Sequence, residues 1–213
     1  YYGLPDSWVV CGNGAADVIW RLVLYYKPRR AVLPAPTFSE YAEALESAGC
    51  QICYADLSAQ EGFVPGEAFC QAITPQTDIC FFCNPNNPTG VVYSADTLTR
   101  MAEILTEKSA QYGHNIFLVS DEPYRDIVFD GKTVPYPAAF YPHTLTCFSY
   151  SKSLSLPGER LGYVAVRPGC EGEDILVDMM SQISRFTGHN CPPSIIQRAV
   201  SCCQKVTSDL SVY

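Results

Sequence analysis

The segments "DICFFC" (78–83), "SADTLTRMAEILTEKSAQYG" (94–113) and "IFLVS" (116–120) decide the fold class. The first and third are short apolar runs, which predict strands. The middle segment predicts a helix, with Ser94 as its N-cap and Gly113 as its C-terminal stop. Together they predict a strand, a helix and a second strand in succession.

The same alternation extends in both directions from this unit. Two more helices are predicted, over residues 15–26 and 39–49. The remaining apolar runs that predict strands are "WVVC" (8–11), "AVLP" (31–34), "QICYA" (51–55), "LTCFS" (145–149) and "GYVAV" (162–166). Strands that alternate with helices predict an α/β fold with a mostly parallel sheet. In such sheets ligands bind at the carboxyl ends of the strands, so the residues after each strand are the candidates for a site.

Length and composition restrict the class of protein. With 213 residues, the chain can form one good core but is too short for two independent domains. Apolar residues make up 47% and charged residues 17%, which is typical of a globular protein. No apolar run approaches the roughly 20 residues of a membrane helix, and the start shows no signal peptide. The net charge of -8 argues against nucleic acid or an anionic membrane as partner.

The eleven cysteines do not predict a metal site. Cys80 and Cys83 are three residues apart in a predicted strand, so their side chains should point to opposite faces and cannot bind one metal ion. Cys202 and Cys203 are adjacent in a predicted helix, and they too are not expected to act together. Free thiols are typical of a reducing compartment, so we expect a cytoplasmic protein without a metal.

Small and aromatic residues follow the first two strands. In "CGNGAAD", Gly14, Ala15 and Ala16 lead into a helix, where exposed backbone N–H groups can bind an anion. A tight turn before a helix would have the same sequence. After the second strand, Phe38 could cover the face of a flat ligand or belong to the core. The residues alone leave both alternatives open.

Polar residues follow the later strands. "CNPNNPTG" forms a rigid turn in which Asn87 can donate to a ligand, and "SDEPYRD" offers the Asp121 carboxylate and the Tyr124 phenol. "SYSKSLSLPGERLGYVAV" (149–166) adds the amine of Lys152 and the guanidinium of Arg160. An anion site, an aromatic cover, a carboxylate and an amine suit a flat, phosphorylated, nitrogen-containing aldehyde. Pyridoxal 5'-phosphate is such a molecule.

The motifs "NNPTG", "SDEPYRDIVFDG" and "SYSKSLSLPGERLGYVAV" occur in the order found in a known family. Through them the chain resembles the large, cofactor-binding domain of fold-type I pyridoxal-phosphate enzymes, the class I/II aminotransferases. The resemblance implies a three-layer αβα sandwich with a mostly parallel seven-stranded sheet. The N-terminal half is most similar to threonine-phosphate decarboxylases and histidinol-phosphate aminotransferases. From "NNPTG" onward, the chain is more similar to aspartate aminotransferases.

The resemblance also implies roles for the residues around the cofactor ring. Lys152 would form the internal aldimine and, as a free amine, move a proton between the substrate Cα and the cofactor. Asp121 would keep the ring nitrogen protonated. Asn87 and Tyr124 would bond the phenolic oxygen of the ring, and Phe38 would stack on its face.

A second group of residues would hold the cofactor phosphate. Arg160 would make the strong charge-assisted contact, next to the Ser149 hydroxyl. The turn at Gly14 and the backbone N–H groups of Ala15 and Ala16 would complete the site. Many relatives carry a hydroxyl residue at the position of Ala16, so one contact would here come from the backbone alone.

Residues 1–213 would correspond to the large domain alone. The resemblance places an N-terminal segment before this chain and a C-terminal small domain after it, with the arginine that binds the substrate carboxylate. It also implies a homodimer of the full-length enzyme, with an amino acid and a 2-oxo acid as substrates. We therefore expect an aminotransferase whose 213 residues bind cofactor with little turnover. The alternatives are a decarboxylase of the threonine-phosphate type and a cofactor-binding sensor module.

Overall fold

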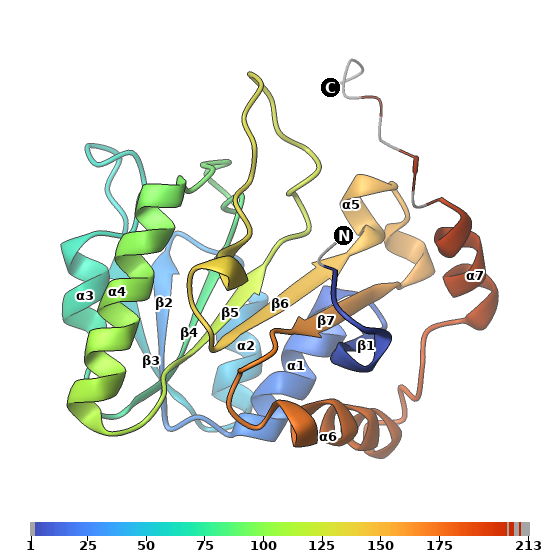
Figure 1. Cartoon of the computed structure of the whole chain (residues 1–213), viewed down its shortest axis with the longest axis horizontal. Helices are drawn as coiled ribbons and strands as arrows, with labels where there is room; N and C mark the ends of the chain where they lie inside the picture. Colours follow the sequence, from blue (N-terminus) through green and yellow to red (C-terminus); the bar gives the residue numbers. More distant parts are fainter. Residues whose placement is uncertain (1–2, 204, 207–208, 210–213) are drawn as a thin grey trace.

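The strands of the chain form a single sheet (Figure 1). The computed structural model describes residues 3–203, 205–206 and 209. The strands in the described part are β1 (Val9–Gly12), β2 (Arg30–Ala35), β3 (Gln51–Asp56), β4 (Thr77–Cys83), β5 (Phe117–Asp121), β6 (Thr144–Ser149) and β7 (Gly162–Val166). Their order across the sheet is β1-β7-β6-β5-β4-β2-β3, and β7 runs in the direction opposite to the other six strands. The predicted mostly parallel, seven-stranded sheet is confirmed.

Helices connect most of the strands. In the described residues they are α1 (Ala15–Tyr26), α2 (Glu40–Ser47), α3 (Glu67–Ala72), α4 (Ala95–Tyr112), α5 (Tyr150–Ser153), α6 (Glu173–Phe186) and α7 (Ser194–Cys202). Short 3₁₀ turns lie at Asp6–Trp8, Pro137–Ala139 and Pro157–Glu159. The helices predicted over 15–26, 39–49 and 94–113 are present as α1, α2 and α4. The sequence reading did not predict α3, α5 or α6.

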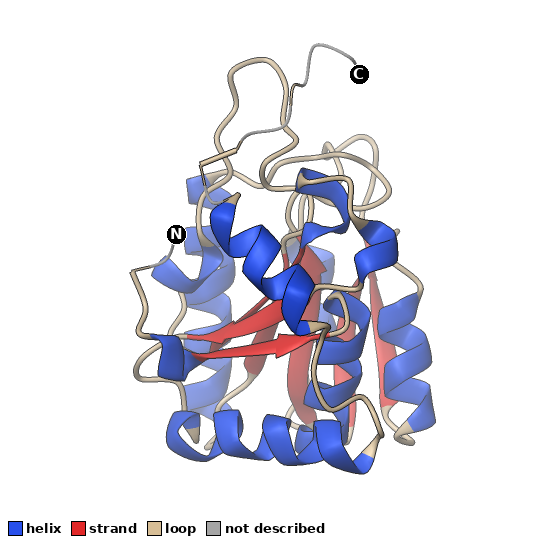
Figure 2. Cartoon of the chain, turned by 90° about the vertical axis from the view of Figure 1, so that its right-hand side faces the viewer, coloured by secondary structure: helices blue, strands red, loops and turns tan. Residues whose placement is uncertain are grey.

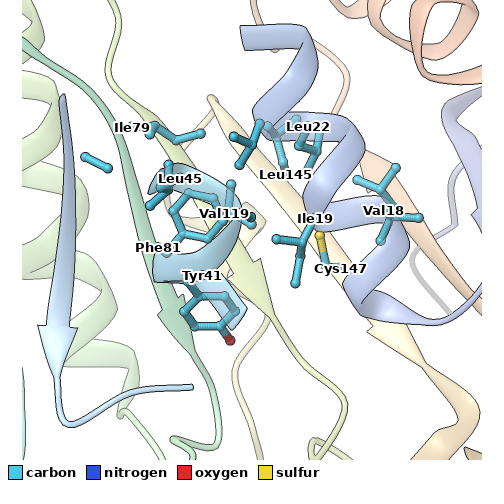
Figure 3. Packing of buried hydrophobic residues seen from close by; sticks show 14 of the residues in the cluster. Val18, Ile19, Leu22, Tyr41, Leu45, Ile79, Phe81, Val119, Leu145 and Cys147 are labelled. Carbon is cyan, nitrogen blue, oxygen red and sulfur yellow. The ribbon is translucent and has the colours of Figure 1, made fainter. Parts of the chain in front are cut away.

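Two apolar cores lie on the two faces of the sheet, because side chains alternate along each strand. In β4, Ile79 and Phe81 join the core beneath α1, α2 and α6, which Figure 3 shows in part. Cys80 and Phe82 join the core beneath α3 and α4. Figure 2 shows the resulting layers, with helices on both sides of the strands. Cys83 contacts Tyr41 on the face opposite Cys80, as its spacing predicted.

The ends of α4 follow the sequence signals that predicted them. The hydroxyl of Ser94 accepts a hydrogen bond from the backbone N–H of Thr97 at 3.1 Å, which satisfies a free donor of the first turn. At the other end, Gly113 adopts a φ of 75° and donates its N–H to the Ser109 carbonyl at 3.0 Å. The predicted N-cap and C-terminal stop are both confirmed.

The direction of β7 brings distant parts of the chain to one edge of the sheet. Gly162, its first residue, pairs with Gly12 at the end of β1 and with Ser149 at the end of β6. Cys83 and Asp121, the last residues of β4 and β5, pair with each other in a parallel ladder. The segments after β1, β4, β5 and β6 therefore lie at the same edge as the segment before β7, which contains Arg160.

Membrane-spanning helices and clusters of metal ligands are both absent from the described residues. None of their helices combines the length and the apolar character that a membrane span requires. Nor do three or more His, Cys, Asp or Glu side chains of residues 3–203, 205–206 and 209 come together as metal ligands. All eleven cysteines lie in this part of the chain as free thiols.

Candidate active site

The start of α1 forms one side of the site. Gly14 precedes the helix with a φ of 87°, a conformation that side chains rarely adopt. A Cβ added to Gly162 would lie 2.7 Å from the carbonyl carbon of Gly14 and 2.9 Å from the nitrogen of Ala15. The absence of side chains thus lets β7 pass close beneath the helix start. The first N–H groups of a helix have no partner within it, and here they are available to an anion.

Arg160 lies directly beside this helix start. Its guanidinium donates to the Asn13 carbonyl at 3.0 Å and to the Pro157 carbonyl at 2.9 Å. A Cβ on Gly14 would come within 2.6 Å of its Nη2, so the glycine also leaves room for the arginine. The structure therefore brings together two of the predicted phosphate-binding groups.

Ser149 is the last residue of β6 and precedes α5. Its side chain is buried, and its position in the register opposite Gly162 places it close to the α1 start. The hydroxyl at this position is the third of the predicted phosphate-binding groups. Ala16, whose side chain has no polar group, lies in the first turn of α1.

Asp121 is a buried acid at the end of β5. Tyr41 donates its hydroxyl hydrogen to Oδ2 of this carboxylate at 2.7 Å. The other oxygen, Oδ1, is buried and has no hydrogen-bond partner among the described residues. Burial raises the pKa of Asp121 to about 7, although the Tyr41 hydrogen bond acts in the opposite direction. A buried carboxylate oxygen of this kind requires a donor.

Phe38 lies half-buried on the segment between β2 and α2. Its ring packs edge-on against Tyr41, with 5.6 Å between the ring centroids. Because Tyr41 holds Asp121, the predicted aromatic cover and the predicted acid belong to one cluster. Phe38 also packs against the core beneath α1 and α2, as expected for a core residue, and its role as a cover for a ligand stays a prediction.

Lys152 and Tyr124 face each other across the edge of the sheet. The Lys152 amine lies 5.5 Å from the centroid of the Tyr124 ring, within the range of a cation–π contact. Lys152 is exposed and sits in α5, the four-residue helix directly after β6. Tyr124 is half-buried in the turn after β5. The amine is therefore accessible and next to one of its predicted partners.

Asn87 lines a cavity of about 330 Å³ together with Tyr124. The other two asparagines of "CNPNNPTG" stabilise the turn itself. Asn84 accepts the backbone N–H of Tyr93 at 2.9 Å, and Asn86 accepts the hydroxyl of Thr89 at 2.6 Å. The turn thus uses two of its three amides. Asn86 and Asn87 both line the cavity, and the amide of Asn87 is the one that the turn does not use.

Two features of the site were missed from the sequence. One is Tyr41, although it follows Phe38 by three residues, a spacing that places side chains on one face of a helix. The other is Arg125, which stacks 3.8 Å from the centroid of Phe148, bonds the Tyr163 hydroxyl at 3.0 Å and lies 3.6 Å from Glu122. Through these contacts, Arg125 links the turn after β5 to Phe148 on β6 and Tyr163 on β7.

The residues at this edge fit a flat ligand with a phosphate and a ring nitrogen. The backbone N–H groups at the start of α1 and the Arg160 guanidinium together suit a phosphate. The unpaired Oδ1 of Asp121 suits a protonated ring nitrogen. Pyridoxal 5'-phosphate carries both groups, and the Lys152 amine can react with its aldehyde.

Comparison with known proteins agrees with this geometry. The family model "Aminotransferase class I and II" matches residues 4–204. Threonine-phosphate decarboxylase of Salmonella typhimurium is 34% identical over 77% of this chain and 43% of its own length. A probable aspartate aminotransferase of Methanocaldococcus jannaschii is 31% identical over 84% of this chain and 46% of its own. The chain spans about half the length of these curated relatives.

Solved structures give the same result. An aminotransferase from Eubacterium rectale matches 99% of this chain and 54% of its own, with a TM-score of 0.91 and 34% identity. Aspartate aminotransferase from Thermus thermophilus with maleate matches 92% and 49%, with a TM-score of 0.80 and 26% identity. Class I and II aminotransferases depend on pyridoxal phosphate, the cofactor that the residues of this site fit. With a family model that matches nearly its whole length, the chain belongs to the class I and II aminotransferase family.

Proposed function

We propose that residues 1–213 form the cofactor-binding large domain of a pyridoxal-phosphate-dependent aminotransferase, which moves an amino group between an amino acid and a 2-oxo acid. The observation that carries this proposal is the Asp121 carboxylate, buried, held on one oxygen and unpaired on the other. It lies at the same sheet edge as an accessible lysine and an arginine beside a helix start. Pyridoxal phosphate, when bound, acts as an electron sink for the bond broken at the substrate Cα.

The residues of this chain would divide the work around that cofactor. The Lys152 amine would bind the cofactor aldehyde covalently and, as a free amine, would move a proton between the substrate Cα and the cofactor. The ionised Asp121 keeps the ring nitrogen protonated. Asn87 and Tyr124 bond the phenolic oxygen, and Phe38 covers the ring.

The phosphate would be held by backbone and side chain together. The N–H groups of Ala15 and Ala16, after the turn at Gly14, bind it at the helix start. Arg160 adds charge and Ser149 a hydroxyl. The pairing of β6 with β7 brings these groups to the same sheet edge as Lys152. A phosphate held there would orient the aldehyde of the cofactor toward the amine.

Decarboxylation is the second candidate function. The similarity to a threonine-phosphate decarboxylase favours it, since that relative shares 34% of aligned residues with this chain. The two reactions differ in the bond broken at the substrate Cα. Release of CO₂ from threonine phosphate would support the decarboxylase, and conversion of the cofactor to its amine form by an amino acid would support the aminotransferase.

We further propose that the full-length protein is a cytoplasmic homodimer. Cys11, Cys191 and Cys202 are exposed as free thiols, which suits a reducing compartment. Light scattering of the full-length protein measures its mass directly. A monomer with bound cofactor would contradict the dimer.

Reduction of the bound cofactor tests the proposed function at Lys152. Protein mixed with pyridoxal phosphate should absorb in the visible range, and borohydride should fix the cofactor on Lys152, as located by peptide mass spectrometry. Lys152→Ala should abolish both signals. Lys132 lines the cavity that contains Asn87 and Tyr124, so Lys132→Ala is the matched control and should retain both. A label on Lys108 or Lys132 in the unchanged protein would refute the assignment.

A further inference from the structure

The Tyr41 hydroxyl reaches the Asp121 carboxylate from a different part of the fold. Tyr41 is fully buried on α2, whereas Asp121 ends β5, 80 positions later in the chain. Figure 3 shows the Tyr41 ring at one end of the apolar cluster, with its hydroxyl pointing away from the aliphatic side chains. The hydroxyl donates to Oδ2 at 2.7 Å.

Among the described residues, the other titratable groups around this carboxylate provide neither a positive charge nor a hydrogen bond that would stabilise its ionised form. The thiols of Cys83 on β4 and Cys147 on β6 are buried, and burial raises the pKa of both, so they remain neutral. Glu122, the next residue, would repel a second negative charge and accepts a hydrogen bond from Ser120. In the described part of the chain, Tyr41 is therefore the side-chain donor that contacts Asp121.

We propose that Tyr41 is a positioning residue for the cofactor-binding acid: its hydroxyl holds Oδ2 of Asp121 and leaves Oδ1 as the oxygen that meets the ring nitrogen. This inference rests on the proposed function and assigns a role to a residue outside the predicted site. A hydrogen bond to the ionised form of an acid favours that form, and burial disfavours it. Tyr41 thus opposes the burial that would otherwise keep Asp121 protonated and unable to pair with a cationic ring.

The packing around Tyr41 fixes its hydroxyl in place. Its ring lies 5.4 Å from the centroid of Phe81 on β4 and 5.6 Å from that of Phe38. The phenol is therefore packed against two aromatic rings and has no exposed surface. Since Phe38 and Tyr41 belong to the segment that begins α2, one element would supply both the cover of the ring and the orientation of the acid.

Titration of the cofactor-free protein tests the inference without any turnover. Tyr41→Phe removes one oxygen and keeps the ring, and the pKa of Asp121, followed by carboxyl ¹³C NMR, should rise by about one unit. Tyr141→Phe is the matched control, because that buried phenol donates to the Ile116 carbonyl at 2.7 Å and lies in the other core. The control should leave the titration of Asp121 unchanged. An unchanged pKa in Tyr41→Phe would overturn the inference.

Cofactor affinity separates a positioning role from a purely structural one. The Tyr41→Phe substitution should lower the affinity for pyridoxal phosphate about tenfold, the equivalent of one pKa unit. The affinity for an analogue in which carbon replaces the ring nitrogen should stay unchanged. Equal losses for both molecules would show that Tyr41 only supports the fold. If the unchanged protein binds neither molecule, the proposed function fails, while the titration still decides the role of Tyr41.

A second variant covers the case in which Tyr41→Phe does not fold. A ring-fluorinated tyrosine at position 41 keeps the packing and is a stronger donor. It should lower the pKa of Asp121 relative to the unchanged protein. A pKa that stays the same or rises would overturn the inference.

Discussion

Arg160 occupies an unusual backbone conformation at the entrance to β7. Its φ of 51° lies in the left-handed region, which costs a residue with a side chain on the order of 1–3 kcal/mol. The two hydrogen bonds of its guanidinium, to the carbonyls of Asn13 and Pro157, hold it in this conformation. The strain is thus located where the side chain meets the start of α1, as expected for a binding residue.

Substitution of Arg160 should reduce affinity through the phosphate alone. Arg160→Lys retains the charge but loses the planar pair of donors, so pyridoxal phosphate should bind roughly 10-fold more weakly, and Arg160→Ala up to about 100-fold. Pyridoxal, which lacks the phosphate, should bind all forms equally in a fluorescence titration. Arg100→Ala removes an exposed guanidinium on α4 and serves as the control. An equal loss for pyridoxal would place Arg160 elsewhere than at the phosphate.

Position relative to the strands explains which site residues the sequence revealed. Asp121, Lys152 and Arg160 each stand next to an apolar run that predicted a strand, so their shared edge could be inferred before the structure. Tyr41 could not be found in this way. Its partner is 80 positions distant, and only the packing of α2 on β4 and β5 brings the two side chains together.

Among the elements, β7 and α1 make a close backbone contact at the site. Gly162 lies under the first turn of α1, and a Cβ there would be 2.7 Å from both the Gly14 carbonyl carbon and the Phe148 carbonyl oxygen. Backbone atoms of a strand and a helix cannot easily give way. The contact therefore fixes the helix start against the strand that follows Arg160.

Gly162→Ala should separate these two elements. We expect a loss of about 1–3 kcal/mol in the free energy of unfolding, as for other overpacked sites, together with weaker phosphate binding. Gly158→Ala is the matched control, because a Cβ there meets no atom within 4 Å, and it should change stability by less than about 0.5 kcal/mol. Urea denaturation measures both. Equal stability of the two variants would contradict the packing described here.

The elements differ in how well the sequence predicted them. Most strands could be recognised because they are buried apolar runs, although β3 buries only Ala55, and α4 could be recognised because its cap residues make the expected hydrogen bonds. The six-residue α3 buries only Phe69 and Ala72, too few for a clear period. In α6, Leu176, Met180 and Ser184 are buried at intervals of four, a signal that was present but not used. The reversed direction of β7 depends on its pairing with β1 and β6, which local sequence does not contain.

For the molecule as a whole, the site reduces the stability of the cofactor-free protein. The fold buries the Asp121 carboxyl, and its pKa rises to about 7 from the ordinary value near 4. Between these two values the folded state holds a proton that the unfolded state has lost. Stability should therefore fall as the pH rises through this window, because ionising the buried acid opposes folding.

This pH dependence can be isolated with Asp121→Asn, which is neutral at every pH. From pH 5 to pH 8, the cofactor-free protein should lose roughly 2–3 kcal/mol of stability relative to this variant, as measured by urea denaturation. Taking the difference removes the titration of the groups that do not interact with Asp121. Glu122, whose pKa burial raises to about 8, does interact with it and contributes to the difference. Saturation with pyridoxal phosphate should reduce the loss, since the ionised carboxylate then faces a protonated ring nitrogen, and the variant should show no such rescue. A constant difference between the two proteins across this range would mean that Asp121 titrates in the folded state as it does in water, and that its burial is not what prepares it for a cationic ring.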